Sequence, residues 1–226
     1  MSGEIVTIGQ ATLYHGDCRE ILLSLPKVDL VLTDPPYGIG FSYDGEYQDS
    51  EHGYQDLISI LRGFPLALLQ YPEEMMRLIC PVLGAPDEVD LWVYNSNLPR
   101  QSRMWGFWGV NVNFSAVKQK AKNFDCSKVK ELHVSSYDWT SDFQQVKGNG
   151  SEKTDHPCQI PVGLVERIIG LTLPGSVVDP FMGSGTTGVA CANMGKTFYG
   201  IERERKYFDI ACERIERAYA QQRLFA

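Results

Sequence analysis

The chain has 226 residues, of which 43% are apolar and 22% are charged, and its formal net charge is −7. These fractions are typical of a soluble globular protein with a full core. No apolar run is long enough to span a bilayer, and the first residues lack the pattern of a signal peptide. The six cysteines and four histidines are scattered without a Cys-x-x-Cys pair, so we expect reduced thiols in a cytosolic protein and no metal site.

The charges are unevenly distributed along the chain. Residues 98–153 hold 9 Lys+Arg and 5 Asp+Glu, a net charge of +4, whereas the rest of the chain has a net charge of −11. An acidic total argues against a nucleic-acid partner, but a basic segment can face phosphates. On charge alone, a solvated surface is the favoured interpretation of this segment.

The order of apolar and polar residues predicts strands that alternate with helices. Predicted strands span 11–15 (paired with 4–8 across a turn at Gly9), 28–33, 89–94, 176–179 and 197–202. Predicted helices span 19–25, 57–83 with proline interruptions, 160–171, 186–194 and 205–224, while 41–55 is predicted to be a mobile loop and 96–150 to be irregular. This alternation predicts an α/β fold in one domain, 1–226, whose mostly parallel sheet has helices on both faces.

The most informative motif is Asp34-Pro35-Pro36-Tyr37, which directly follows the predicted strand at 28–33. Proline has no amide hydrogen and a fixed φ, and a residue before proline is held extended. The Asp34 carboxylate and the nearby carbonyls are therefore fixed beside the flat face of Tyr37. This arrangement suits a planar substrate with an amino group. The alternatives are that Asp34 only caps a turn and that Tyr37 is a core aromatic.

A second motif, Asp179-Pro-Phe-Met-Gly-Ser-Gly-Thr-Thr-Gly188, leads from a predicted strand into a helix. Its glycines let backbone amides approach a ligand, and a helix N-terminus favours negative charge. Glu202 ends the next strand, where its carboxylate can accept both ribose hydroxyls of a nucleoside. The spacing also matches the dinucleotide fingerprint, and a glycine turn that only packs a helix on a strand is a further alternative.

Two features favour S-adenosylmethionine over a dinucleotide. Asp179 precedes the glycines, and a carboxylate there can pair with the ammonium of a methionine moiety but would repel a pyrophosphate. The same chain holds the Asp34 motif, for which a dehydrogenase has no evident use. An NAD(P)-binding oxidoreductase is the alternative from a different class.

With these motifs the chain resembles DNA amino-methyltransferases, which modify an exocyclic nitrogen, in the β arrangement where the catalytic motif precedes the cofactor motif. The resemblance covers residues 11–37 and 156–217. It implies a Rossmann-like S-adenosylmethionine-dependent methyltransferase fold with a seven-stranded sheet, circularly permuted, in which Met1 lies near Ala226. It also implies that the catalytic residues are Asp34, Pro35, Pro36 and Tyr37.

The resemblance assigns the cofactor site as well. Asp17 would accept the amino group of the cofactor adenine, although it could instead cap the helix that follows. Glu202 corresponds to the ribose-binding acid, and His156, more often a structural residue, lies in the block beside the methionine end. The expected cofactor-binding residues are Asp17, Cys18, His156, Asp179, Phe181, Gly183, Ser184, Gly185, Thr186, Thr187 and Glu202.

Two departures from the family pattern bear on function. Ile160 stands where the family usually has a lysine, so a lysine contact to the cofactor is absent. The irregular basic insertion, 96–153, is short for a separate target-recognition domain and is interpreted as a reduced target-recognition region. Its candidate DNA contacts are Arg100, Arg103, Lys118, Lys120 and Lys122.

The resemblance implies a site-specific methyltransferase that acts on double-stranded DNA, as in restriction-modification. The target base would be flipped into the site, where Asp34 and the Pro35 carbonyl hold its amino group and Tyr37 stacks on it. An aspartate at the head of the catalytic block usually accompanies adenine N6 and a serine cytosine N4, so adenine is favoured and cytosine N4 is the alternative.

Other functions are disfavoured. Methyltransferases for RNA or protein glutamine have similar catalytic blocks but another motif order, and the intact motifs argue against a non-catalytic DNA-binding subunit. We expect a cytoplasmic protein of prokaryotic or phage origin, with a homodimer left open.

Overall fold

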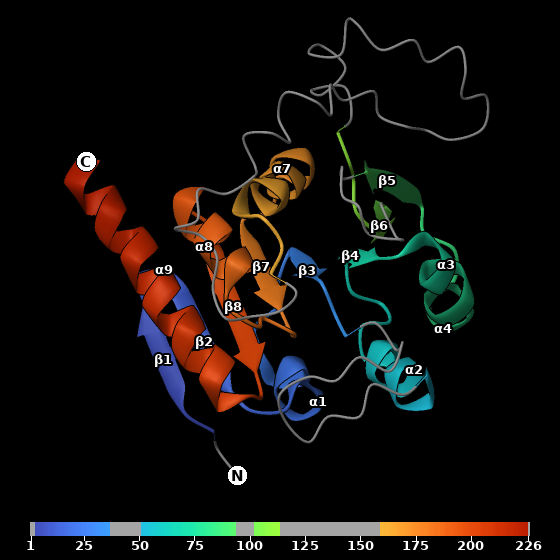
Figure 1. Cartoon of the computed structure of the whole chain (residues 1–226), viewed down its shortest axis with the longest axis horizontal. Coiled ribbons are helices and arrows are strands. Elements are labelled where there is room, and N and C mark those ends of the chain that lie inside the picture. The colour runs from blue at the N-terminus through green and yellow to red at the C-terminus, as the bar shows by residue number, and fades with distance from the viewer. Residues whose placement is uncertain (1–2, 37–50, 94–101, 114–158, 226) are drawn as a thin grey trace, which may run out of the picture. The chain divides into compact units, whose positions relative to one another are not determined.

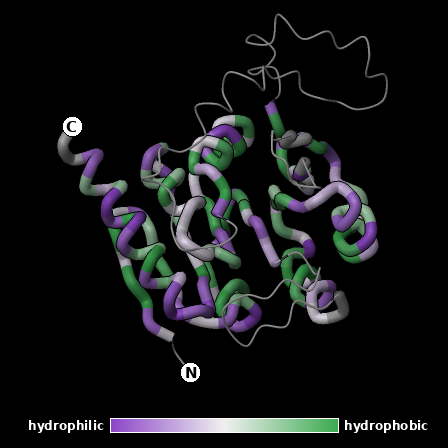
Figure 2. The backbone as a smooth tube through the Cα atoms, viewed as in Figure 1, coloured by the Kyte–Doolittle hydropathy of each residue, from purple (hydrophilic) through white to green (hydrophobic). Residues whose placement is uncertain are grey.

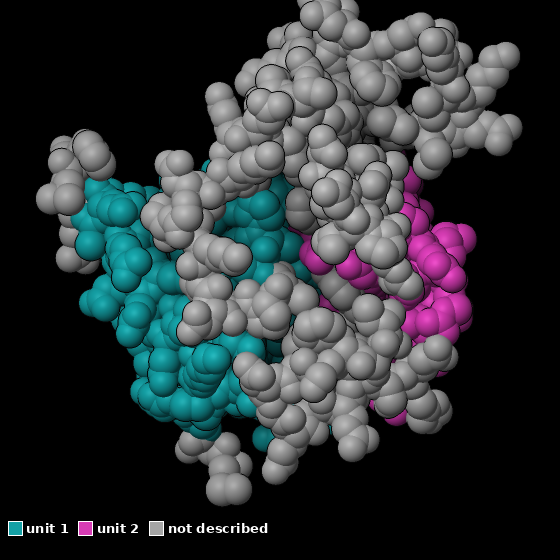
Figure 3. All heavy atoms as spheres, in the orientation of Figure 1, with its two compact units in different colours: residues 1–34, 148–226 teal, residues 35–147 magenta. Residues whose placement is uncertain are grey.

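The computed structural model describes residues 3–36, 51–93, 102–113 and 159–225. They belong to two compact units: residues 1–34 with 148–226 form the first, and residues 35–147 form the second (Figures 1 and 3). Each unit has its own strands and helices, and each is described by itself below.

The first unit begins with a β-hairpin. Strand β1 (Ile5–Ile8) pairs antiparallel with β2 (Ala11–His15) across a turn at Gly9. This hairpin confirms the strand pair predicted on either side of Gly9. A short helix, α1 (Cys18–Ile21), and a 3-10 turn, η1 (Leu22–Ser24), follow it.

Parallel strands build the rest of this sheet, in the order β1-β2-β8-β7-β3. Strand β2 pairs in parallel with β8 (Thr197–Glu202), β8 with β7 (Ser176–Asp179), and β7 with β3 (Leu30–Thr33). At the amino ends of β3 and β7, the Asp29 carboxylate accepts hydrogen bonds from the amides of Gly175 and Ser176 and from the Ser176 hydroxyl. Because the parallel strands run the same way, their carboxyl ends meet at one edge of the sheet.

Three helices cover one face of this sheet: α7 (Val162–Thr172), α8 (Thr186–Asn193) and α9 (Arg205–Phe225) (Figure 1). Figure 2 shows the apolar residues concentrated along the strands and the inner sides of these helices. Fully buried side chains include Leu13, Val31, Val178, Phe198, Ile169 and Ile215. The predicted α/β class and mostly parallel arrangement are thus confirmed.

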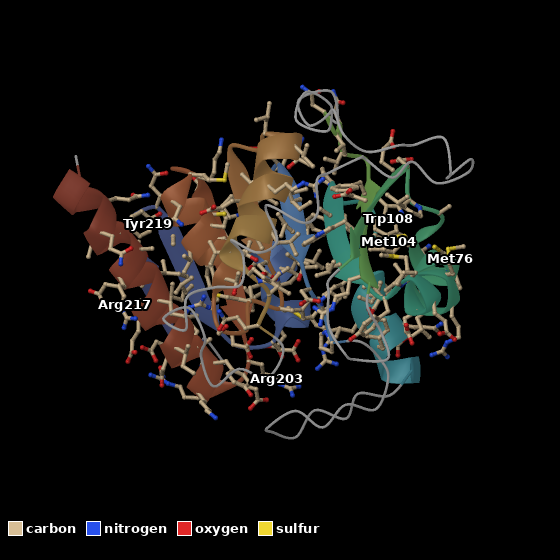
Figure 4. All side chains as sticks on the ribbon, turned by 45° about the horizontal axis from the view of Figure 1, so that its top comes forward. Met76, Met104, Trp108, Arg203, Arg217 and Tyr219 are labelled. Atoms are coloured by element: carbon tan, nitrogen blue, oxygen red, sulfur yellow. The ribbon has the colours of Figure 1, made fainter. Side chains whose placement is uncertain are left out.

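Helix α9 runs alongside the hairpin. Near its start Arg205 pairs with Glu4, and further along the Tyr219 hydroxyl accepts a hydrogen bond from the Gln10 amide at 3.1 Å (Tyr219 is labelled in Figure 4). At about 1.5 Å per residue, the end of α9 lies roughly 30 Å from its start. Met1 and Ala226 lie outside the described residues, and the residues beside them are at opposite ends of α9. The described residues next to the two termini are therefore far apart, in contrast to the expected proximity of Met1 and Ala226.

The second unit has three antiparallel strands in the order β4-β6-β5. These are β4 (Leu66–Gln70), β5 (Glu88–Val93) and β6 (Ser102–Trp108). Its helical segments are α2 (Glu51–Ser59), α3 (Pro72–Glu74), a π-helical turn η2 (Met75–Ile79) and α4 (Cys80–Leu83). The side-chain amide of Gln70 donates a hydrogen bond to the buried Tyr54 hydroxyl at 2.9 Å, which joins β4 to α2.

Side chains alternate along β6, so Met104 and Trp108 share one of its faces (both are labelled in Figure 4). Gly106 lies between them, and a Cβ there would come within 2.6 Å of the Trp108 ring. The Trp108 indole also donates to the Gly84 carbonyl at 3.1 Å. Trp108, the last residue of β6, therefore connects this strand to the end of α4.

The structure corrects three predicted segments. Residues 57–83 were expected to be helical, but the run Leu66–Gln70 is a fully buried strand. The segment 96–150, predicted to be irregular, contains β6, and the predicted loop 41–55 includes the start of α2 at Glu51. Residues 41–50, 96–101 and 114–150 of these segments lie outside the described residues. The described part of the chain thus holds eight strands, where the resemblance implied seven.

We predict that Gly188→Ala in α8 destabilises the protein. A Cβ at this position would lie 2.3 Å from Ile215 Cδ1 on α9 and 2.7 Å from Phe198 Cε1 on β8. Overpacking of this kind costs about 1–3 kcal/mol. Gly170→Ala in α7 is the matched control, because nothing lies within 4 Å of its Cβ. The control should instead gain roughly 0.5–1 kcal/mol from a helix-favouring residue. Urea unfolding midpoints measure both, and equal changes would contradict the packing argument.

Candidate active site

The predicted site residues of the first unit gather at the carboxyl ends of four strands. Asp17 follows β2, Asp34 follows β3, Asp179 ends β7 and Glu202 ends β8. In the register of the sheet, His15 of β2 lies opposite Glu202, and Val31 of β3 lies opposite Val178. This edge of an open α/β sheet is where such folds bind ligands. The sequence motifs far apart in the chain are therefore brought together by strand pairing.

The cofactor motif forms a tight turn between β7 and α8. Gly183 and Gly185 have φ values of 51° and 80°, a region that glycine adopts without strain. The Gly185 amide donates to the Met182 carbonyl at 2.9 Å, and Gly185 is the N-cap of α8. A Cβ at Gly185 would come within 2.8 Å of Ala211 Cβ on α9. The turn thus needs glycine both for its backbone and for its contact with α9.

The Asp179 carboxylate is buried, with 3% of its surface exposed. One oxygen accepts hydrogen bonds from the Thr33 hydroxyl at 2.7 Å and the Phe181 amide at 3.1 Å, and the other accepts from the Thr187 hydroxyl at 2.6 Å. Burial raises the pKa of Asp179 to about 6, against the opposing effect of these hydrogen bonds, and the nearby charge of Asp34 adds to the rise. The carboxylate therefore joins β3, the turn and α8, and its predicted contact with a cofactor ammonium remains a prediction.

The Asp34 side chain is partly exposed and lies close enough to Asp179 to affect its pKa. Since Thr33 immediately precedes it, Asp34 is carried by the end of β3 that bonds to Asp179. The catalytic carboxylate predicted from the sequence is thus next to the cofactor turn. Pro35 and Pro36 open the second unit, and Tyr37 lies outside the described residues.

Glu202 is partly buried and ties the turn to the end of β8. Its carboxylate accepts hydrogen bonds from the Gly183 amide at 2.8 Å and from the Glu204 amide at 2.7 Å. Burial raises its pKa to about 7, although these backbone hydrogen bonds act in the opposite direction. A carboxylate has about four acceptor positions, so lone pairs remain for ribose hydroxyls.

Asp17 caps α1, as the alternative interpretation of the sequence proposed. Its carboxylate accepts from the Arg19 amide at 2.9 Å and forms an ion pair with the Arg19 guanidinium. The hydrogen bond from the Arg19 side chain is the main cause that lowers the Asp17 pKa. Cys18 is buried behind it, and burial raises the pKa of its thiol to about 12. Whether Asp17 also binds adenine stays a prediction.

Sequence reasoning missed Arg214, which holds the cofactor turn from α9. Its guanidinium donates to the Ser184 carbonyl at 2.6 Å, the Ser184 hydroxyl at 3.0 Å and the Thr186 hydroxyl at 3.3 Å. Ser184, Thr186 and Thr187 are all buried. The three hydroxyls therefore take part in the internal structure of the turn and of α8, and the predicted cofactor contacts of these residues stay predictions. An arginine within an amphipathic helix gives no sequence signal of such a contact.

The remaining predicted residues are not placed at this site. His156, Arg100, Lys118, Lys120 and Lys122 lie outside the described residues. Arg103 belongs to β6 of the second unit, where its guanidinium lies over the Tyr71 ring at 5.4 Å. Among the described residues, no group of three or more His, Cys, Asp or Glu side chains is arranged to hold a metal ion. No helix of the described part is both long and apolar enough to cross a membrane.

Comparison with known proteins adds the family context. The N6/N4 DNA methylase family matches residues 85–213, which is more than half of the chain. The type II methyltransferase M.ScaI of Streptomyces caespitosus is 27% identical over 246 aligned residues, which cover 90% of this chain and 81% of that protein. M.BglII of Bacillus subtilis is 27% identical over 247 residues, which cover 88% of this chain and 67% of its own length.

Solved structures agree with this family context. The complex of M1.HpyAVI with SAM has a TM-score of 0.61 and 26% identity, and the match covers 91% of this chain and 98% of that chain. The cytosine-N4-specific PvuII DNA methyltransferase has a TM-score of 0.62 and 19% identity, and the match covers 95% and 93% of the two chains. At that identity the second likeness supports the fold alone.

Substitution of Asp179 should change how stability depends on pH. Because the folded-state pKa of about 6 lies above the ordinary value of 3.8, the folded state binds this proton more tightly. The stabilisation that the Asp179 carboxyl group gives to the folded state is therefore present below pH 3.8 and is lost as the pH rises to 6 and above. Over this pH range the free energy of unfolding of the wild type should fall by on the order of 1–3 kcal/mol. The Asp179→Asn variant should not show this fall.

Urea unfolding at pH values from 4 to 7.5 measures this difference. The control is Glu213→Gln, which removes an exposed carboxylate on α9. Its stability profile should run parallel to that of the wild type. A parallel profile for Asp179→Asn as well would show that this carboxylate is not perturbed.

Proposed function

The chain belongs to the N6/N4 DNA methylase family, and we propose that it transfers a methyl group from S-adenosylmethionine to the N6 amino group of adenine in double-stranded DNA. The observation that carries this proposal is the position of Asp34. It follows β3, and the neighbouring strand β7 leads directly into the glycine turn. A carboxylate that can hold an amino group thus lies beside the turn that is proposed to hold the methyl donor.

The described residues fit the methyl donor. In the turn from β7 to α8, Gly183 and Gly185 have positive φ values and carry no side chain, which lets a ligand approach the backbone closely. Glu202 presents a carboxylate that is already fixed by two backbone amides and can accept ribose hydroxyls. S-adenosylmethionine supplies a methyl group on a positively charged sulfur. We assign its ribose to Glu202 and its adenine amino group to Asp17.

The roles on the substrate side follow from hydrogen-bond chemistry. A base must leave the helical stack before its amino nitrogen can be reached. Asp34 and the Pro35 carbonyl then accept the two N–H bonds, which fixes the nitrogen for attack, and positioning of this kind can supply a large part of the rate. As the nitrogen gains positive charge, the Asp34 carboxylate stabilises it. Tyr37 is assigned to stack on the base, and Lys118, Lys120 and Lys122 to contact phosphates.

Adenine is preferred over cytosine because Asp34, rather than a serine, heads the catalytic block. The PvuII enzyme, which shares the fold, is named as cytosine-N4-specific, so the family includes both bases. Methylation of cytosine N4 is therefore the second candidate function. Mass spectrometry of nucleosides from treated DNA distinguishes the two products. We expect N6-methyladenine, and N4-methylcytosine in its place would overturn the choice of base while leaving methyl transfer intact.

Asp34→Ala should abolish methyl transfer while binding of S-adenosylmethionine largely survives. Loss of the group that holds and stabilises the amine is expected to lower kcat by a factor on the order of 100 or more. Tritium transfer to DNA measures the rate, and calorimetry measures cofactor affinity. Glu213→Ala, which removes an exposed carboxylate on α9, is the control and should keep wild-type activity. Near-normal turnover by Asp34→Ala would refute the assigned role.

A further inference from the structure

The buried carboxylate of Asp179 is satisfied from inside the first unit. Its donors are the Thr33 hydroxyl, the Thr187 hydroxyl and the Phe181 amide, at 2.7, 2.6 and 3.1 Å. Both threonines are buried, with 0% and 2% of their surfaces exposed. Every donor thus belongs to an element of the site: β3, α8 or the turn. The carboxylate is a junction between these elements rather than a group that faces solvent.

Thr33 is the part of this junction that belongs to the catalytic strand. Backbone pairing between β3 and β7 joins Leu30 to Val177 and Val31 to Val178. The hydrogen bond from Thr33 to Asp179 carries the connection forward to the carboxyl ends of both strands. Asp34 is the next residue in the chain. Its position relative to the cofactor turn therefore depends on a side-chain contact made one residue earlier.

We propose that Thr33 is a positioning residue, which holds Asp34 at a fixed place relative to the cofactor turn through the buried carboxylate of Asp179. This inference rests on the proposed function and deepens it. Asp34 and Asp179 are both acidic and close together, so their charges repel. A hydrogen bond to a charged, buried acceptor is stronger than one between neutral groups and has a narrow geometry. The Thr33 hydroxyl can therefore keep the two strand ends in register despite that repulsion.

The inference is tested by removing each threonine hydroxyl in turn. Thr33→Val breaks the link from Asp179 to β3, whereas Thr187→Val breaks the link from the same carboxylate to α8. The two changes are matched, because each removes one hydroxyl that donates to Asp179. Thr33→Ser keeps the donor and serves as the rescue variant. Steady-state kinetics of methyl transfer and calorimetry with S-adenosylmethionine are measured on all three, with melting temperatures to compare folding.

Thr33→Val should lower kcat by a factor of about 10–100, because small displacements of a catalytic group have effects of this size. Its affinity for S-adenosylmethionine should stay within about threefold of wild type, and Thr33→Ser should restore kcat. Thr187→Val should weaken cofactor binding more than it lowers kcat at saturating cofactor. Equal losses of kcat in Thr33→Val and Thr187→Val, or normal turnover by Thr33→Val, would overturn the inference.

Hydrogen exchange separates this inference from the proposed function. Exchange of the peptide that covers residues 28–34 should be faster in Thr33→Val than in Thr187→Val or the wild type. This readout needs no activity, so it tests the link even with a DNA substrate that is not methylated. If the wild type methylates neither base, the proposed function fails, while the exchange data still decide whether Thr33 holds the end of β3. Unchanged exchange in Thr33→Val would count against the link.

Discussion

The buried carboxylate at the end of β7 constrains the rest of the described site. A buried charge needs hydrogen-bond donors, because an unsatisfied carboxylate away from water is costly. In this chain the donors come from three different elements: Thr33 on β3, Thr187 on α8 and the Phe181 amide in the turn. Each element can bring its donor within hydrogen-bond distance of the Asp179 carboxylate only from one position. The catalytic strand and the cofactor turn are therefore positioned by a shared requirement and cannot shift independently of each other.

A second constraint comes from behind the turn, where α9 packs closely. A Cβ at Gly185 would come within 2.8 Å of Ala211 Cβ on α9, and a Cβ at Gly188 within 2.3 Å of Ile215 Cδ1 on the same helix. Arg214, on the same helix, binds the Ser184 carbonyl and two hydroxyls of the turn. The glycines at 185 and 188 are thus required by packing. The interpretation as a packing turn is therefore supported for these residues, and their contact with a cofactor stays a prediction.

The elements of the first unit were largely predictable from the sequence, whereas in the second unit the sequence predicted β5 but missed β4 and β6. Strands β7 and β8 match their predicted bounds, because each is a short apolar run that ends at an acidic residue. Strand β4 was mistaken for helix, since a short apolar run gives no periodicity and only the flanking Pro65 and Pro72 pointed to a strand. The link from Thr33 to Asp179 could not be read from the chain at all. It joins residues 146 positions apart, and it depends on which strands are neighbours.

Residues of the site that were given two competing interpretations can carry both roles. Glu202 uses its carboxylate to fix Gly183 and Glu204, yet those bonds leave acceptor positions open. Because the carboxylate is already held in place, a ribose bound there would require little further ordering of the protein, which favours affinity. Asp17 differs, since the Arg19 side chain occupies its carboxylate and an adenine amino group would have to share it. Of the two acids, Glu202 is therefore the better prepared to bind a nucleoside. The hydrogen bonds that each carboxylate makes within the protein set how many acceptor positions it can offer to a ligand.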